Sequence, residues 1–513
     1  MKKKALISVF DKKNIVNFAK KLSDLSYEII STGGTAKLLS EAGISITPVS
    51  KITNFPEMMN GRVKTLHPKI HGGILGNWDL ESHKQDAEKL EIDPISIVVV
   101  NLYPFEKTVL NPDSSHQDII ENIDIGGPSM LRSAAKNYKH VTVITDFTDY
   151  DKVIAELEQN GETSLETRQK LSYKAFSLTA HYDAMISAYF SKLEKDSFPN
   201  SLSLSYEKTE QLRYGENPHQ QAAFYSDPNN EIISQIFGKK LSFNNYMDID
   251  SAIRIIAKFM NDDPAIAILK HTNPSGIGIG KNLTEAYQKA FATDTMSPFG
   301  GIVIMNKQLD LEAAKEINKV FTEIIISPEF SEDVLAFLKK KKNRRLIKLN
   351  FEKLKYMKSQ KNVRSLLNGL LVQDSDMLED NYEDWKIVTE NKPSESEIKA
   401  LKFGWKVVAT LKSNAVCFTT DDRTIGLGIG QTSRVDSTEI AIFKAHKFGL
   451  EIQNSICASD AFFPFRDSID KLSELGIKAI IQPGGSKRDQ EVIDACNEYG
   501  MSMIFTGKRH FRH

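Results

Sequence analysis

The chain has 513 residues, more than one hydrophobic core usually organises, so we expect two to four domains. Its 66 lysines and arginines nearly balance its 67 aspartates and glutamates, which argues against a general nucleic-acid or membrane surface. The three cysteines (Cys417, Cys457 and Cys496) form no CxxC pair, which argues against a cysteine zinc site and fits a reducing compartment. The N-terminal apolar run ends at Asp11, too early for a signal peptide, and no run reaches membrane-spanning length. We therefore expect a cytoplasmic protein.

The first third of the chain alternates the signals of strands and helices. Asp11 can cap a helix whose apolar face carries Ile15, Phe18, Ala19 and Leu22. A second, shorter helix is predicted at 35–42. Strands are predicted at 5–9, 27–30, 97–100 and 141–145. This order favours a largely parallel sheet with helices on both faces.

Two polar segments divide the rest of the chain. Residues 194–205 read as a linker, and 374–397 form an acidic stretch between two regions of further strands and helices. We therefore expect one domain at 1–195 and another at 200–513, the second divided by a polar connection near 374–398.

The segment 265–276 carries the most specific chemical signal. A buried strand is predicted to end in Lys270 and His271, and Pro274 and Gly276 indicate that the extended run is over. Ligands of α/β sheets bind at strand ends, where an imidazole and an ammonium provide a base and a cation. The alternative is a surface strand end with a solvated lysine and a hydrogen-bonded histidine.

Residues 32–35, Thr-Gly-Gly-Thr, lie between a predicted strand and a predicted helix. Glycines allow close backbone approach, and the free N–H groups of a helix start attract phosphate. Lys12 follows the first strand and reaches the same sheet edge in a doubly wound topology. These residues predict a phosphate site, although a tight turn alone also uses a Gly-Gly pair.

The segment 61–68 places two cations, Arg62 and Lys64, on one face of an extended chain. An exposed loop is the alternative. His67 and His71 have a spacing that invites a metal site, but Pro68 disfavours a helix interior there and no acidic ligand accompanies them. No metal is predicted.

Polar groups also follow the strand predicted at 97–100, where Asn101 and Tyr103 lie. Asp124 precedes a helix that Pro128 can begin, and Lys136 lies eight residues into it. Asp124 and Lys136 can pair as proton handler and orienter, or each can be an ordinary surface charge.

Beyond the linker, four segments combine cations with aromatic rings or glycines. In 212–220, an arginine and a tyrosine can grip a phosphate and stack on a planar base. The others are a glycine turn at 297–301, an aromatic set at 459–467 that can equally be core, and a cationic tail at 508–513.

Together these segments resemble the bifunctional phosphoribosylaminoimidazolecarboxamide formyltransferase and inosine monophosphate (IMP) cyclohydrolase family of purine biosynthesis. The resemblance covers essentially the whole chain. The segments that carry it, in family order, are GRVKTLHP, NLYPF, IDIGGPSMLRSAAKN, RYGENPHQ, LKHTNPSG, SDAFFPFRD and the C-terminal Arg-His-Phe.

The resemblance implies an α/β fold with a methylglyoxal-synthase-like N-terminal domain that carries the cyclohydrolase. It also implies a C-terminal transformylase of two subdomains that resemble cytidine deaminase. Zinc is not implied, because the HxE and PCxxC elements of zinc deaminases are absent. A structural potassium ion stays open, and the family's usual homodimer is expected.

For the transformylase, the resemblance makes His271 the base that deprotonates the attacking amine and Lys270 the group that stabilises the oxyanion. Its nucleotide pocket would contain Arg213, Tyr214, Gly300, Glu323, Asn414, Arg434, Phe462 and Arg509. Its site for the cosubstrate 10-formyltetrahydrofolate would contain Val435, Asp467, Ser486 and Lys487.

For the cyclohydrolase, the resemblance assigns the proton donor or acceptor to Lys136. Lys64 and Tyr103 are expected to steady the oxygen during ring closure, and Asp124 and Lys136 to manage the amide proton. The nucleotide would be bound by Lys12, Thr32, Gly33, Gly34, Thr35, Arg62, Thr65, Asn101 and Ile125.

Two residues depart from the family pattern. Phe10 stands where many members have serine, so one phosphate hydroxyl is lost, and Glu323 stands where aspartate is common. The expected reactions are formyl transfer to 5-aminoimidazole-4-carboxamide ribonucleotide and dehydrative closure of the product to IMP. The alternatives are a nucleotide sensor without catalysis and a monofunctional transformylase, the latter supported only by Phe10.

Overall fold

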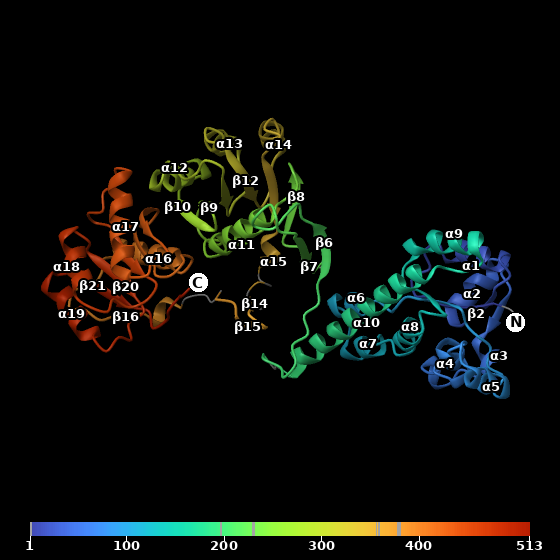
Figure 1. Ribbon diagram of the computed structural model, residues 1–513. Helices are drawn as coiled ribbons and strands as arrows, with labels where there is room; N and C mark the ends of the chain where they lie inside the picture. Colours follow the sequence, from blue (N-terminus) through green and yellow to red (C-terminus); the bar gives the residue numbers. More distant parts are fainter. Residues whose placement is uncertain (1–2, 195–196, 228–230, 355–356, 358–359, 377–380) are drawn as a thin grey trace. The chain divides into compact units, whose positions relative to one another are not determined.

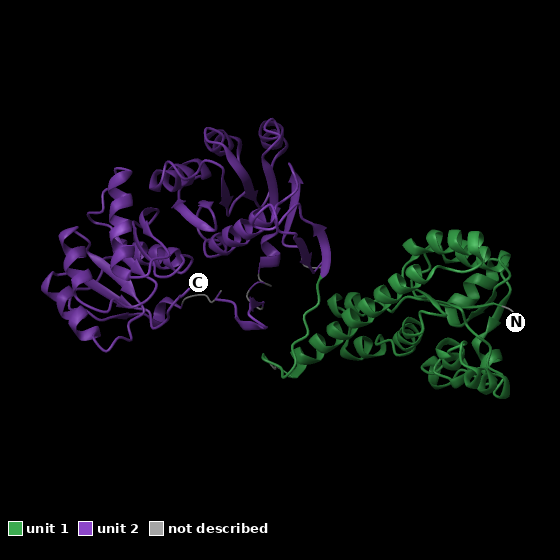
Figure 2. Ribbon diagram, in the orientation of Figure 1, with its two compact units in different colours: residues 1–206 green, residues 207–513 purple. Residues whose placement is uncertain are grey.

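The computed structural model describes residues 3–194, 197–227, 231–354, 357, 360–376 and 381–513. The chain forms two compact units, residues 1–206 and 207–513, coloured separately in Figure 2. No helix among the described residues is both long and apolar enough to cross a membrane.

The first unit is built on one sheet of five parallel strands in the order β3-β2-β1-β4-β5. The strands are β1 (Lys4–Ser8), β2 (Glu28–Ser31), β3 (Ile46–Pro48), β4 (Ile97–Val100) and β5 (Thr142–Ile144). The helices are α1 (Ile15–Asp24), α2 (Gly33–Glu41), α3 (Val49–Thr53), α4 (Pro68–Leu75), α5 (Glu81–Lys89), α6 (Phe105–Leu110), α7 (His116–Glu121), α8 (Gly126–Lys136), α9 (Tyr150–Asn160) and α10 (Leu165–Glu194), with 3-10 turns η1 (Met59–Gly61) and η2 (Phe147–Asp149).

The four predicted strands and the two predicted helices of this unit are confirmed, while β3 was not predicted. Helix α1 buries Ile15, Phe18, Ala19 and Leu22, as its spacing predicts. The prediction that Asp11 caps this helix is wrong. The helix begins after Asn14, and the Asp11 carboxylate accepts a hydrogen bond from the N–H of Lys13 at 3.0 Å. The order of strands reverses between β1 and β4, so a cleft is expected beyond their carboxyl ends.

The second unit contains two six-stranded mixed sheets, ordered β10-β9-β11-β12-β13-β8 and β18-β17-β19-β20-β21-β16. The strands of the first sheet are β8 (Ile233–Phe237), β9 (Ala265–Lys270), β10 (Asn273–Ile279), β11 (Gly301–Met305), β12 (Thr322–Ser327) and β13 (Arg345–Leu349). The strands of the second are β16 (Lys386–Ile387), β17 (Val416–Thr419), β18 (Thr424–Gly428), β19 (Ile456–Ser459), β20 (Ala479–Gln482) and β21 (Ser502–Phe505). Two hairpins stand apart, β6 (Glu207–Gln211) with β7 (Ala223–Ser226) and β14 (Lys361–Leu366) with β15 (Gly369–Asp374).

The two sheets have the same topology. In each, an antiparallel hairpin precedes three parallel strands, and an antiparallel strand closes the far edge. The helices are α11 (Phe243–Ala257), α12 (Leu283–Thr293), α13 (Leu311–Ile317), α14 (Glu332–Leu338) and α15 (Phe351–Leu354), then α16 (Glu395–Val408), α17 (Arg434–Lys447), α18 (Asp467–Glu474) and α19 (Asp489–Glu498), with the 3-10 turn η5 (Tyr382–Asp384) (Figure 1). This duplication fits the two subdomains that the resemblance implies.

The strand predicted at the start of 265–276 is confirmed, but the prediction that the extended run ends there is wrong. Residues 271 and 272 form a two-residue turn, and the chain continues as β10 through Pro274. Strand β10 lies at the edge of its sheet, where a proline costs no ladder hydrogen bond. The register shifts between Pro274 and Gly276.

The two halves of this unit meet where β10 and β18 run antiparallel. Gly278 pairs with Arg423, and the N–H of Ile277 donates to the Thr424 hydroxyl at 3.0 Å. Because β10 and β18 run in opposite directions, the amino end of β10 lies on the same side as the carboxyl end of β18. The edges of the two sheets at these strand ends therefore face the same way. A shared apolar core that includes Trp405 packs residues of both halves.

The basic run 339–345 follows α14, and it is not all solvated. Arg344 is fully buried, and Arg345 makes an ion pair with Glu323. The C-terminal tail is also anchored. The carbonyl of Arg512 accepts from the N–H of Ser413 at 2.9 Å, and the Arg512 guanidinium donates to the carbonyl of Thr410 at 2.8 Å.

Candidate active sites

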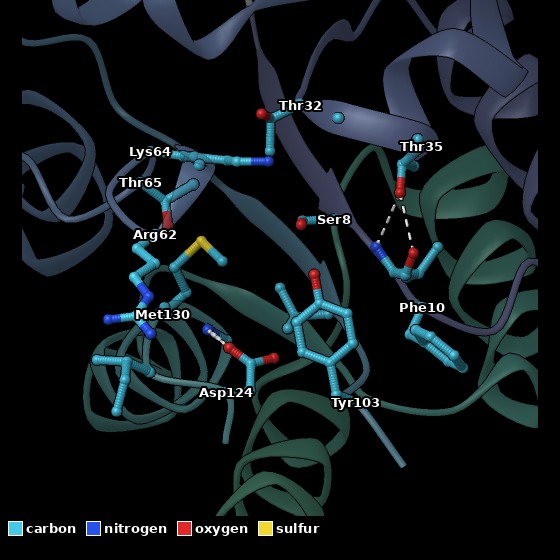
Figure 3. A pocket seen from close by; sticks show the side chains of 18 of the residues that line it. Ser8, Phe10, Thr32, Thr35, Arg62, Lys64, Thr65, Tyr103, Asp124 and Met130 are labelled. Carbon is cyan, nitrogen blue, oxygen red and sulfur yellow. Dashed lines mark hydrogen bonds between the residues drawn. The ribbon is translucent and has the colours of Figure 1, made fainter. Parts of the chain in front are cut away.

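A cavity of about 830 Å³ lies beyond the carboxyl ends of β1, β2 and β4 in the first unit (Figure 3). Its walls come from the loops that follow these strands, from η1 and from the start of α8. They include all the cyclohydrolase residues predicted above except Lys136, namely Lys12, Thr32, Gly33, Gly34, Thr35, Arg62, Lys64, Thr65, Asn101, Tyr103, Asp124 and Ile125.

The start of α2 forms the upper wall of this cavity. Gly33 adopts φ +56°, a left-handed conformation that glycine adopts without strain. The buried Thr35 hydroxyl donates to the carbonyl of Val9 at 2.9 Å and accepts from Lys12 Nζ at 2.8 Å. Burial lowers the pKa of Lys12. The amino end of a helix and a positioned ammonium make this wall suited to a phosphate.

The turn at η1 carries the two predicted cations of this loop. Lys64 Nζ lies 3.3 Å from a carboxylate oxygen of Glu57, and Arg62 makes an ion pair with Glu121. Gly61 adopts φ +82°, a left-handed conformation that favours glycine. Neither Glu57 nor Glu121 was predicted from the sequence as a site residue.

Asp124 lies on the opposite wall, just before α8. Its carboxylate accepts from the N–H of Gly127 at 2.8 Å, and a Cβ at Gly127 would lie 2.5 Å from it. The N–H of Asp124 donates to the hydroxyl of Tyr182 in α10 at 2.8 Å. Burial raises the pKa of Asp124. A carboxylate whose pKa is raised is a stronger proton acceptor than a solvated one.

Tyr103 and Phe10 line the cavity from two neighbouring loops. In Figure 3 the Tyr103 hydroxyl points into the cavity between Asp124 and Ser8. The Phe10 ring contacts the Tyr103 ring edge-on, with centroids 5.4 Å apart. Asn101 holds the Phe10 loop, since its Oδ1 accepts from the N–H groups of Phe10 at 2.5 Å and Asp11 at 3.1 Å.

Lys136 does not reach this cavity in the chain that carries it. It is the last residue of α8 and is exposed, ten residues beyond Gly126, or roughly 15 Å along the helix axis. The expected pairing of Asp124 with Lys136 is therefore not formed within one chain. The two histidines considered for a metal have other partners: His67 caps α4 by accepting from the N–H of Lys69, and His71 bonds to Ser133.

In the second unit, Lys270 and His271 lie at one edge of the first mixed sheet. Lys270 Nζ donates to the carbonyl of Phe299 at 2.9 Å. His271 is exposed and adopts φ +52°, and Thr272 follows with φ +64°. Two left-handed residues in a two-residue hairpin make a primed turn, which fits the twist of paired strands. The turn presents the imidazole at the sheet edge.

Asp248 in α11 supports this turn, although sequence analysis did not identify it. Its carboxylate accepts from the N–H of Thr272 at 2.7 Å. The pKa of the Asp248 carboxyl group is raised, mainly by burial and also by the charge of Glu323. The hydrogen bond from Thr272 and the charge of His271 act in the opposite direction and lower it. No local motif could have indicated Asp248, since it lies 24 residues before Thr272, its hydrogen-bond partner, and gains its role only from the fold.

Glu323 and Gly300 extend the same edge, because β11 and β12 begin there. Glu323 Oε1 accepts from Arg345 at 2.8 Å and from Asn245 at 3.1 Å. Gly300 adopts φ +71°, and a Cβ at Gly301 would lie 2.5 Å from the carbonyl oxygen of Leu269. The glycines therefore allow the loop to approach the strand that ends in Lys270.

Arg213 and Tyr214 lie on the loop after β6. The Arg213 guanidinium is 5.4 Å from the Tyr214 ring centroid. The same loop is joined to α11, because Asn244 donates to the carbonyl of Glu216 at 3.3 Å. An arginine beside an aromatic ring can bind an anion next to a planar group.

The second sheet presents its predicted residues at the carboxyl ends of β18 to β21 and the start of β17. Arg434 is held by three side chains, because its guanidinium donates to Asp460 at 2.6 Å, to Ser459 at 2.8 Å and to Asn414 at 3.1 Å. Asp460 is fully buried and belongs to this network, although sequence analysis assigned it no role. The predicted residues on the loops and helix starts at this edge are Asn414, Arg434, Val435, Phe462, Asp467, Ser486, Lys487 and Arg509.

The residues predicted to bind the cosubstrate are held in different ways. Val435 is 40% exposed in the first turn of α17. The Ser486 hydroxyl accepts from the N–H of Arg488 at 3.1 Å, and Asp467 accepts from the N–H of Ser468 at 2.8 Å. Lys487 is exposed.

The fold and the sites define a two-part α/β enzyme. One part is a doubly wound domain with an anion-binding cavity, and the other is a duplicated mixed-sheet domain with a histidine and a lysine at a sheet edge. Among the described residues, no group of three or more His, Cys, Asp or Glu is placed to hold a metal ion.

Comparison with known proteins identifies the family. The sequence model of the AICARFT/IMPCHase bienzyme matches residues 134–444, and that of the MGS-like domain matches residues 14–129. The chain belongs to the AICARFT/IMPCHase bienzyme family. This confirms the predicted fold class and the prediction of a bifunctional enzyme of purine biosynthesis that joins a formyltransferase to a cyclohydrolase.

Full-length relatives support this assignment. The chain is 49% identical to proteins described as "Bifunctional purine biosynthesis protein PurH" from Lactobacillus delbrueckii subsp. bulgaricus, Streptococcus pyogenes serotype M2 and Lactococcus lactis subsp. cremoris, over 100% of both chains in each case. A solved structure, "Crystal structure of ForH", is 35% identical and covers 37% of this chain and 100% of its own, with a TM-score of 0.34. That TM-score supports no structural conclusion.

Proposed function

We propose that the cavity of the first unit is the cyclohydrolase site and that the paired sheet edges of the second unit form the transformylase site. The observation that carries the first assignment is the gathering of Lys12, Lys64, Tyr103 and Asp124 around one cavity of about 830 Å³. Such a volume accommodates a nucleotide. The domain boundaries proposed are 1–195 and 200–513.

In the cyclohydrolase site, the phosphate lies at the start of α2 near Lys12 and Thr35. The carboxamide nitrogen of the substrate attacks the formyl carbon, and water then leaves. Asp124 accepts the amide proton, and the raised pKa of its carboxyl group supports that role. Tyr103 and Lys64 steady the oxygen of the formyl group. Lys136 completes this proton path only if another copy of the chain supplies it.

In the transformylase site, the imidazole of His271 takes a proton from the weakly nucleophilic 5-amino group as that nitrogen attacks the formyl carbon. Lys270 stabilises the developing oxyanion. Collapse of the oxyanion breaks the bond between the formyl carbon and N10 of the folate, and tetrahydrofolate leaves as N10 takes the proton held by His271. Arg213, Tyr214, Gly300 and Glu323 contact the nucleotide from the first sheet's side. The other nucleotide residues, Asn414, Arg434, Phe462 and Arg509, contact it from the second. The formyl donor is 10-formyltetrahydrofolate, held by Val435, Asp467, Ser486 and Lys487.

We propose that the enzyme acts as a cytoplasmic homodimer on small-molecule substrates, without a nucleic-acid or membrane partner. We also propose that catalysis needs no zinc and that the protein can bind a structural potassium ion.

The experiment supplies purified protein with 5-aminoimidazole-4-carboxamide ribonucleotide and 10-formyltetrahydrofolate and follows both products. Formation of tetrahydrofolate and IMP is expected. Tetrahydrofolate without IMP would indicate a monofunctional transformylase, and neither product would indicate a nucleotide sensor.

A further inference from the structure

The phosphate wall of the first cavity already holds a carboxylate of the chain itself. Glu57 Oε1 accepts a hydrogen bond from the Thr32 hydroxyl at 2.5 Å, and Glu57 Oε2 lies 3.3 Å from Lys64 Nζ. Both partners of Glu57 line the cavity. A hydroxyl, an ammonium and the start of a helix are the groups that bind phosphate oxygens. The carboxylate therefore occupies a position suited to part of a phosphate group.

The backbone fixes Glu57 opposite Lys64. Met58 and Val63 pair as an isolated antiparallel bridge, so the residues just outside it, Glu57 and Lys64, are cross-strand neighbours. The turn between them is strained, because two consecutive residues that are not glycine, Met59 and Asn60, both have φ +53°. Strain of this kind is concentrated at sites where a segment has a function.

The contact is accessible to an incoming ligand. The Glu57 side chain is 41% exposed and that of Lys64 is 30% exposed. The hydrogen bond from Thr32, followed by Lys64, lowers the pKa of Glu57, so its carboxylate is ionised at neutral pH. Exposed ion pairs contribute about 1 kcal/mol or less, so a phosphate dianion with more acceptor oxygens can replace this one.

We propose that Glu57 is an exchangeable internal anion, which occupies the phosphate subsite when it is empty and, when a nucleotide binds, releases the Thr32 hydroxyl to the phosphate and Lys64 to the formyl oxygen. This inference rests on the proposed cyclohydrolase site. Inorganic phosphate must displace Glu57 with no other contact to compensate, whereas a nucleotide also gains contacts of its base and ribose. Glu57 therefore lowers occupancy by small anions and shortens the residence of the product.

The test compares Glu57→Gln with the wild-type chain. Glutamine keeps an oxygen that can accept from the Thr32 hydroxyl but removes the competing charge. Calorimetric titration with IMP should show binding that is about two- to fivefold tighter, the factor that corresponds to an exposed ion pair. Inhibition of cyclisation by inorganic phosphate should strengthen by a similar factor, and the affinity for inosine, which has no phosphate, should not change.

Glu41→Gln is the matched control, because Glu41 is exposed at the carboxyl end of α2, the end opposite the phosphate wall, and the charge change is identical. It should leave IMP binding unchanged. Unchanged or weaker IMP binding by Glu57→Gln would overturn the proposal and make Glu57 a support for Lys64 alone. If the wild-type chain itself fails to bind IMP, the proposed cyclohydrolase site is wrong, and the inference that rests on it is wrong too.

Discussion

In the first unit the predicted functional residues surround one cavity, whereas in the second they lie along the edges of two sheets. All strands of the first sheet are parallel, so the loops after β1, β2 and β4 reach the same edge without any partner. The second unit repeats one topology twice, yet Lys270 lies where the parallel strands of its sheet begin and Arg434 lies where those of the other sheet end. The two halves therefore share a topology but present different functional residues.

The antiparallel contact of β10 with β18 explains why this arrangement can work. It turns the opposite edges of two similar sheets toward the same side of the unit. A site built in this way depends on both halves, while the first unit's cavity depends on one sheet. The comparison predicts that the two reactions can be removed separately.

The largest effect is expected for His271. Without its imidazole, formyl transfer should fall by about 10²- to 10⁴-fold, the usual contribution of a general base. His271→Ala removes the base, and His271→Asn is the better control for folding, since asparagine tolerates the φ of +52°. Formyl transfer is measured by tetrahydrofolate release. Both variants should close supplied formylated nucleotide at the wild-type rate, and loss of both activities would contradict separate sites.

Asp124→Asn should have the reverse selectivity, with cyclisation reduced by about 10²-fold or more and formyl transfer retained. Asparagine keeps an oxygen for the N–H of Gly127 but cannot accept the amide proton. Cyclisation is followed by IMP absorbance with supplied formylated nucleotide. Retained cyclisation would remove Asp124 from the mechanism.

The same variant tests the electrostatics of the cavity. Because burial raises the pKa of Asp124, its ionised form costs stability above that pKa, and the cost disappears below the unfolded value of about 3.9. Asp124→Asn should therefore raise the melting temperature at pH 7. The gain should shrink as the pH falls toward 4. A melting temperature that is lower at pH 7 would show that the carboxylate stabilises the fold instead.

A smaller effect is expected for Asp248, which acts through the turn that carries His271. Asp248→Ala removes the acceptor of the Thr272 N–H, and we expect the kcat of formyl transfer to fall about tenfold, the cost of one buried hydrogen bond, with little change in KM. Asp248→Asn keeps an acceptor oxygen and should restore most of the rate. Equal losses in both variants would assign the effect to charge rather than to the turn.

The smallest effect is expected for Phe10, the residue that departs from the serine of the family pattern described above. Phe10→Ser should tighten nucleotide binding in the first unit by about two- to fivefold, because one hydroxyl regains a hydrogen bond of about 1 kcal/mol while the contact with Tyr103 is lost. Titration with IMP measures it, and formyl transfer should not change. Weaker binding would show that the contact of Phe10 with Tyr103 matters more.

The sequence predicted those features that local patterns determine. Apolar runs located four of the five strands of the first unit, and the spacing of Ile15, Phe18, Ala19 and Leu22 located the buried face of α1. Residues just after a strand, such as Asn101, could be placed at the cavity because a parallel sheet brings its strand ends together.

Features that depend on tertiary neighbours were missed. Pro274 was interpreted as the end of an extended run, since the sequence does not reveal that β10 is an edge strand. Asp248 and Glu57 carry no local signal, and their partners are known only once the chain is folded. Lys136 was assigned by family resemblance, and the length of α8 separates it from the cavity of its own chain.

The central claim, that one chain carries two independent sites, is tested most directly by mixing the two variants. Asp124→Asn and His271→Asn proteins are each supplied with 5-aminoimidazole-4-carboxamide ribonucleotide and 10-formyltetrahydrofolate, first separately and then together. We expect neither variant alone to form IMP and the mixture to form it, because the first releases the formylated nucleotide that the second closes. A mixture that forms no IMP would contradict the claim.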